Sequence, residues 1–131
     1  MPDERKPITT KDIENVLELF RRAKTELNMA NDELKYCDDK TQDYLHELEL
    51  VDHTYHERGR IAKELAELRQ KRRAAKDRIE LMTPIVNWSV QYKSSIDGLQ
   101  RVLGEMRKID ARQSNRLYFY RADEKGKTIG A

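Results

Sequence analysis

The sequence predicts an all-α protein: a three-helix, coiled-coil-like assembly in which a long antiparallel helical hairpin is joined by a third helix and a short extended C-terminal tail. Charged residues make up 38% of the 131-residue chain and the mean hydropathy is −0.94, which suits the narrow apolar seams of long helices better than a broad globular core. Only five Gly and three Pro occur, which disfavours the turn-rich β-sandwiches and barrels. Apolar residues also recur at alternating spacings of three and four, the period of a helical seam.

The first helix is expected to begin after a flexible arm, residues 1–9, and to open a single helical domain over residues 10–113. Thr9 or Thr10 is expected to cap it, with Asp12 in its first turn, where a carboxylate stabilises the positive end of the helix. Small seam residues predict the close approach of a neighbouring helix. The two seams of this helix are Ile13, Phe20, Leu27, Leu34, Thr41 and Leu48, and Val16, Ala23, Ala30, Cys37, Tyr44 and Val51.

A second helix is expected from about Tyr55 to Met82. Thr54 and Glu57 have the spacing of a capping box, in which Glu57 reaches back to the N-cap residue. The alternative is one unbroken helix over residues 10–82, roughly 110 Å long, because the seven-residue period also continues through this segment. The seam of the second helix is Ile61, Leu65, Leu68, Arg72, Ala75, Ile79 and Met82.

A third helix is expected from Pro84 to about Gln113, because Thr83 is a good N-cap residue and Pro is favoured at the first helical position. This helix has apolar residues on two sides, and a slender three-helix protein has little interior in which to bury both. We therefore expect a homodimer that uses the second stripe. The main seam is Ile85, Trp88, Tyr92, Ile96, Leu99, Leu103 and Met106, and the expected oligomer contacts are Val86, Val90, Val102 and Ile109.

Residues 114–131 are expected to form an extended aromatic tail. A short aromatic run has high β propensity, but a lone four-residue strand needs a partner on this chain or on another. Aromatic side chains flanked by arginines could stack on bases, but they are more often protein-binding anchors, so we expect the tail to bind a partner. The residues concerned are Arg116, Leu117, Tyr118, Phe119, Tyr120 and Arg121.

Charge is divided unevenly along the chain: residues 1–64 carry a net −5 and residues 65–131 a net +7. A dense basic run in the second helix could follow a phosphate backbone or meet an acidic partner. In an antiparallel hairpin whose facing residue numbers add to about 104, residue 72 would face residue 32, and the same run would instead form ion pairs with acidic residues of the first helix. Those acidic residues are Asp32, Glu33, Asp38 and Asp39. The run consists of Arg69, Lys71, Arg72, Arg73, Lys76 and Arg78.

Several residue patterns are typical of catalytic or metal sites, but each has a structural explanation. Glu49/His53 and Asp52/His56 are i,i+4 pairs, for which surface ion pairing and capping are preferred over metal binding. Glu64 and Glu67, like Asp77 and Glu80, resemble the paired acids of helical Mg²⁺-dependent nucleotide pyrophosphatases, which makes a small nucleotide hydrolase a rival hypothesis. Both pairs fall on one predicted helix about 20 Å apart, whereas that chemistry needs acids from separate helices. Cys37 occupies a seam position, which favours a small buried hydrophobe over a nucleophile. We therefore expect no enzymatic activity, catalytic residue, metal or cofactor.

The sequence favours a cytoplasmic protein that does not enter membranes. No run of 18 apolar residues occurs, and the charged first seven residues lack the apolar segment of a secretory signal. The single cysteine cannot form an intrachain disulfide, which fits a reducing compartment.

Two strings of the sequence resemble a group of small helical proteins encoded by bacteriophages of Gram-positive bacteria. They are QDYLHELEL at residues 42–50 and AKELAELRQKRRAAKD at residues 62–77, and the likeness extends over roughly residues 32–121. The resemblance transfers no site residues. It implies a non-catalytic macromolecular-binding protein, a phage host-takeover or counter-defence factor such as a CRISPR-effector inhibitor, acting on a host or defence protein complex in the bacterial cytoplasm. The alternative is a nucleic-acid-binding protein that uses the basic face of the second helix.

Overall fold

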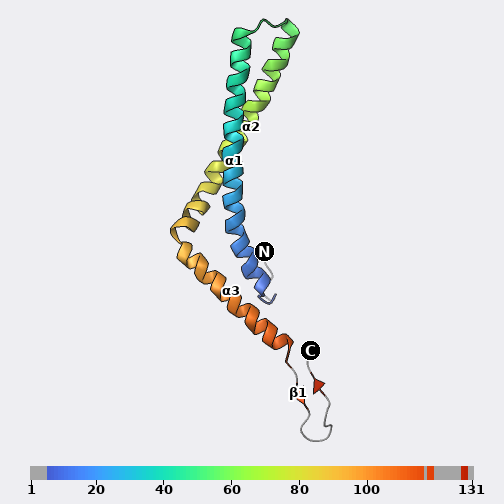
Figure 1. The fold of residues 1–131 in the computed structure, drawn as a ribbon, viewed down its shortest axis with the longest axis vertical. Coiled ribbons are helices and arrows are strands. Elements are labelled where there is room, and N and C mark those ends of the chain that lie inside the picture. The colour runs from blue at the N-terminus through green and yellow to red at the C-terminus, as the bar shows by residue number, and fades with distance from the viewer. Residues whose placement is uncertain (1–5, 117, 120–127, 130–131) are drawn as a thin grey trace. The chain divides into compact units, whose positions relative to one another are not determined.

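The computed structural model describes residues 6–116, 118–119 and 128–129 and confirms the all-α fold class. Three helices follow one another along the chain: α1 (Thr10–Leu50), α2 (Tyr55–Gln91) and α3 (Lys93–Ser114) (Figure 1). Two short strands, β1 (Tyr118–Phe119) and β2 (Thr128–Ile129), follow α3. The chain divides into two compact units, residues 19–91 and residues 1–18 with 92–131, each of which is described by itself below.

The unit of residues 19–91 is an antiparallel helical hairpin. α1 ends at Leu50 and α2 begins at Tyr55, so the expected hairpin is confirmed and the alternative of one unbroken helix is wrong (Figure 1). Residues of the seams predicted for the first and second helices supply all of its core except Val86, and small side chains allow the helix backbones to approach closely. The buried residues of this unit are Ala23, Ala30, Cys37, Ile61, Leu68, Ala75 and Val86.

The boundary predicted at Thr83–Pro84 is wrong, because α2 continues through Pro84 to Gln91 and α3 begins only after Tyr92. A proline inside a helix removes one backbone hydrogen bond and crowds the preceding turn. Here the turn is stabilised in other ways. The Thr83 hydroxyl donates to the Ile79 carbonyl oxygen at 2.6 Å, and beyond the proline Trp88 stacks on Phe20 of α1 with ring centroids 5.5 Å apart. Packing against α1 therefore outweighs the local preference for a helix start.

The other unit combines the first turns of α1 with α3. Thr9 precedes α1, and its backbone N–H donates to the Asp12 carboxylate at 2.8 Å, as expected of a capped first turn. Arg107 of α3 donates to Glu14 at 2.8 Å, and this ion pair lowers the pKa of the Glu14 carboxyl. Leu17 rather than the predicted Val16 is buried here, because this stretch of α1 belongs with α3 and not with α2.

The C-terminal tail finds its strand partner on the same chain. β1 pairs antiparallel with β2, Tyr118 opposite Ile129 and Phe119 opposite Thr128. Within the described part of the tail, Tyr118 and Phe119 are therefore extended as predicted, and β2 was not predicted from the sequence. A ribbon of two residues per strand is at the lower limit of stable pairing.

Candidate interaction surfaces

The hairpin divides the basic run of α2 into three groups with different environments. Two of its arginines form ion pairs within the hairpin. Arg72 Nε donates to Asp38 Oδ1 at 2.7 Å, and Arg78 donates to Glu26. Both acceptors lie on α1, so the ion pairs tie the two helices together. The Arg72–Asp38 pair is among those expected from the sequence, whereas Glu26, the partner of Arg78, was not among the acidic residues expected to pair with the run.

Lys71 lies on a different side of α2 from Arg69 and Arg73. It is two residues from each of them, which corresponds to about 200° around a helix. There it lines a shallow pocket of about 130 Å³. In this pocket a hydrogen bond with the Glu64 carboxylate raises the pKa of the Tyr44 hydroxyl. Lys40 Nζ lies 4.9 Å from the centre of the Tyr44 ring. The other lining residues of this pocket are Tyr36, Glu67 and Leu68.

Arg69, Arg73 and Lys76 form the third group, which we call the basic edge of α2. All three side chains are exposed, and none of them forms an ion pair with any residue that the structure describes. The intrachain interpretation does not extend to these three cations. Their charge is available to a partner.

Two shallow, open hollows adjoin each other between α1 and α2 beside the small residues of the hairpin, and together we call them the apolar groove. Its main section has a volume of about 360 Å³ and lies over Ala30 and Ala75, with Met29, 65% exposed, on its rim. The Glu26–Arg78 ion pair borders both this section and a second one. The lining is completed by Glu33 in the first section and by Leu19, Arg22, Ala23, Met82 and Ile85 in the second.

This groove was not predicted from the sequence, although the sequence contains a signal for it. The numbers of Ala30 and Ala75 add to nearly 104, so the hairpin register places two alanines opposite each other. Each leaves space that a larger side chain would fill, while the large Met29 beside Ala30 stays exposed. A pair of facing small residues next to an exposed large one predicts a hollow.

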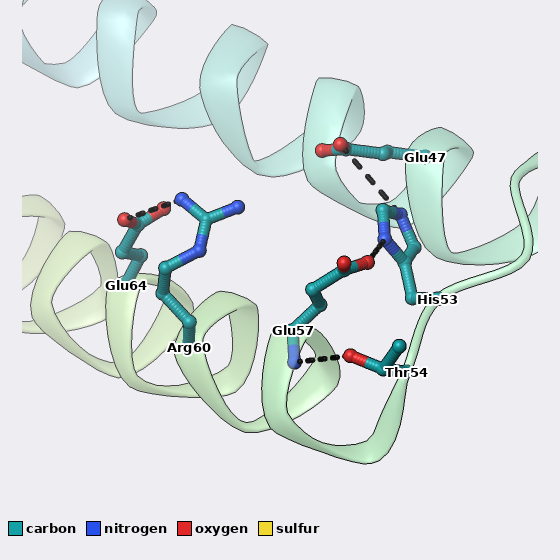
Figure 2. A network of polar contacts seen from close by, with 6 residues as sticks. All are labelled: Glu47, His53, Thr54, Glu57, Arg60 and Glu64. Atoms are coloured by element: carbon teal, nitrogen blue, oxygen red, sulfur yellow. Dashed lines mark hydrogen bonds and ion pairs between the residues drawn. The ribbon is translucent and has the colours of Figure 1, made fainter.

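A polar network holds the hairpin turn at His53 (Figure 2). The His53 side chain is only 8% exposed; its Nδ1 donates to Glu57 Oε2 at 2.8 Å, and its Nε2 lies 3.6 Å from Glu47 Oε1 of α1. The Thr54 hydroxyl oxygen accepts the Glu57 backbone N–H at 3.2 Å, which confirms half of the capping box. The Glu57 carboxylate pairs with His53 instead of reaching back, and this hydrogen bond lowers the pKa of Glu57.

His53 thus pairs with Glu47 and Glu57 rather than with the expected Glu49, and among the described residues no pair of Asp52 with His56 is found. Across the described residues no group of three or more His, Cys, Asp or Glu side chains is arranged to hold a metal ion. The acid pairs that begin at Glu64 and Asp77 both lie on α2, as the sequence analysis expected.

Cys37 is fully buried in the hairpin. Burial raises the pKa of its thiol, and the carboxylate of Glu33, 3.8 Å from Sγ, raises it further. Both effects disfavour the thiolate, which is the reactive form. This agrees with the expectation of a small buried hydrophobe.

The residues expected at an oligomer contact do not share one environment. Val86 is buried within α2, whereas Val90, near the end of α2, is 70% exposed. Val102 and Ile109 lie on α3 and are 45% and 42% exposed. The structure therefore does not place the four on one helical stripe, because α2 ends between Val90 and Val102.

The expected partner-binding tail lies only in part within the described residues. Arg116 is exposed after the end of α3. Tyr118 and Phe119 form β1, whereas Leu117, Tyr120 and Arg121 lie outside the described residues.

Comparison with known proteins finds no match: the chain fits no protein-family model, no curated protein and no solved structure. Within the described part of the chain, no helix has an apolar stretch long enough to cross a bilayer.

Proposed function

We propose that this chain is a non-catalytic macromolecular-binding protein that holds a helix of a protein partner in the groove of its hairpin. The observation that carries the proposal is the apolar groove between α1 and α2, whose floor is made of alanines. With the phage resemblance of the sequence, the proposed role is that of a host-takeover or counter-defence factor acting on a host or defence complex in the bacterial cytoplasm. A CRISPR effector is one example of such a target.

An amphipathic helix is the occupant that the groove fits best. Two antiparallel helices that are closely packed through small residues offer a third helix the space between their ridges. Exposed Met29 would pack against the apolar stripe of that helix, in the helix-in-groove mode of recognition. The rim carries both charges, with Glu33 on α1 and Arg78 on α2, which complements the alternating charges that flank such a stripe.

Two further contacts belong to this proposal. The tail around β1 is proposed to add partner contacts from its aromatic residues. A homodimer is proposed to use the exposed Val102 and Ile109 of α3. Light scattering of the purified protein at tens of micromolar measures the second contact, and a monomer at that concentration would contradict it.

The groove is tested by comparing two matched variants of the full chain. Met29→Glu places a charge at the groove, whereas Leu81→Glu places the same charge at an equally exposed position, 63%, that does not line it. Both replacements keep a good helix former, so helicity should be unchanged. The partner is first identified by affinity capture and mass spectrometry, then purified and titrated.

We expect Met29→Glu to weaken binding of the purified partner at least tenfold, or about 1.4 kcal/mol, and Leu81→Glu to leave it unchanged. A photo-crosslinking residue at position 29 should mark a helical segment of the partner. Equal affinities of Met29→Glu and the unmodified protein would contradict the groove, and equal losses in both variants would show an effect of charge alone.

A further inference from the structure

We propose that the basic edge of α2 binds the phosphate backbone of duplex nucleic acid without reading its bases. This inference goes beyond the proposed function and does not depend on the groove. It rests on three exposed cations that form no ion pair with any described residue: Arg69, Arg73 and Lys76. Lys71, which lies between Arg69 and Arg73 in the sequence, lines the pocket beside Tyr44 instead.

The three cations form one straight row. Their spacing of four and then three residues places them on the same side of the helix, one turn apart. The row spans about 10 Å along the axis at 1.5 Å per residue. Each strand of a duplex presents a phosphate about every 3.4 Å along its axis, so a row of this length can meet several phosphates at once.

The local charge is one-sided. Residues 68–76 contain five cations and no carboxylate. One of the five, Arg72, is already paired with Asp38 of α1. Asp77 and Glu80 follow the row on α2, but neither forms an ion pair with a cation of the row. The row therefore keeps its positive charge in the folded hairpin.

The surface beside the row favours a backbone contact over base recognition. Ala62 and Ala66 continue the same edge toward the start of α2, and both are exposed and small, so a phosphate backbone can come close. α2 carries no aromatic residue between Tyr55 and Trp88 on which an unpaired base could stack, which favours a duplex over a single strand.

The test measures binding of the full chain to a fluorescein-labelled 20-base-pair DNA duplex by fluorescence anisotropy as a function of salt. Three phosphate contacts predict a slope of log affinity against log salt of about −2.7, or about a 40-fold loss between 50 and 200 mM salt. The variant Arg69→Gln, Arg73→Gln, Lys76→Gln should reduce the magnitude of that slope by about 2 to 2.7 and the affinity at 50 mM at least tenfold.

A matched control removes the same charge elsewhere. Lys24→Gln, Lys63→Gln, Lys108→Gln changes three exposed helical cations, one on each helix, and should leave both slope and affinity nearly unchanged. Circular dichroism should show that both triple variants stay folded, since glutamine is also a good helix former. The single variant Arg73→Gln, with an expected slope change of about 0.9, repeats the measurement with the least disturbance.

Any one of four results would overturn the proposal. The first is no binding of the duplex at 50 mM salt. The second is equal weakening by the two triple variants, which would reflect net charge only. The third is competition by polyglutamate as strong as by unlabelled duplex, which would assign the row to an acidic protein. The fourth is a strong preference between this duplex and a second one of unrelated sequence, since equal affinity is what the absence of base reading predicts.

Discussion

Ile61 offers the most quantitative test of the hairpin core. Its side chain has no exposed surface and belongs to the seam of α2, one turn and a half after the helix begins. Truncating a fully buried isoleucine to alanine removes its transfer free energy and leaves a cavity, at a cost of about 2–5 kcal/mol, whereas Ile61→Val should cost about 0.5–1.5 kcal/mol. A domain of this size has only about 5–15 kcal/mol of stability, so Ile61→Ala should lose a large part of it.

Urea unfolding followed by circular dichroism measures this cost. With an m-value of about 2 kcal/mol/M, the midpoint should fall by at least 1 M for Ile61→Ala. Leu81→Ala is the matched control: Leu81 lies on the same helix but is 63% exposed, so its truncation should change stability by less than about 0.5 kcal/mol. Equal midpoints for the two alanine variants would refute the burial of Ile61, and with it the pairing of α2 with α1.

Three further predictions concern single residues. Because Cys37 is buried and its thiol pKa is raised, it should not react with a thiol reagent at pH 8 until denaturant is added; rapid reaction of the folded protein would contradict its placement. The pKa of Glu57 is lowered below its ordinary value of 4.5 by His53, so this carboxylate stabilises the fold above about pH 4.5 and the contribution is lost as the pH falls through the folded pKa. Glu57→Gln should therefore flatten the acid side of the stability profile, and an unchanged profile would show that the pair is not formed. Pro84→Ala should keep α2 helical and raise the free energy of unfolding by up to about 3 kcal/mol, because Pro84 lies inside the helix; a loss of stability would indicate that Pro84 starts a helix after all.

The hairpin and its seams could be predicted because they depend on periodicity alone. Residues spaced by three and four lie on one side of a helix, and small residues such as Ala23 and Ala30 mark the side on which another helix comes close. The register of the hairpin, derived from facing numbers that add to about 104, also predicted correctly that acidic residues of α1 pair with the basic run. It did not predict which cations pair, because that depends on the rotation of α2 about its axis.

The remaining features depend on contacts between distant segments. Local preference places a helix start at Pro84, but stacking of Trp88 on Phe20 keeps the helix intact beyond it. Leu17 is buried because the first turns of α1 belong with α3, which the seven-residue period of α1 does not reveal. The partner strand β2 begins ten residues after β1 begins, and it was not predicted; its only local sign in the sequence is the high β propensity of Thr128 and Ile129.

The antiparallel hairpin is the central claim, since the groove, the ion pairs and the basic edge all follow from it. Pulsed electron paramagnetic resonance between spin labels at Lys24→Cys and Glu80→Cys, in a Cys37→Ala background, measures it most directly. Both positions are exposed, and the Glu26–Arg78 ion pair places them at the same level of the two helices. Helices packed at about 8–10 Å predict a label separation below roughly 30 Å. A distance approaching 80 Å, the length of 56 residues in one continuous helix at about 1.5 Å each, would contradict the account.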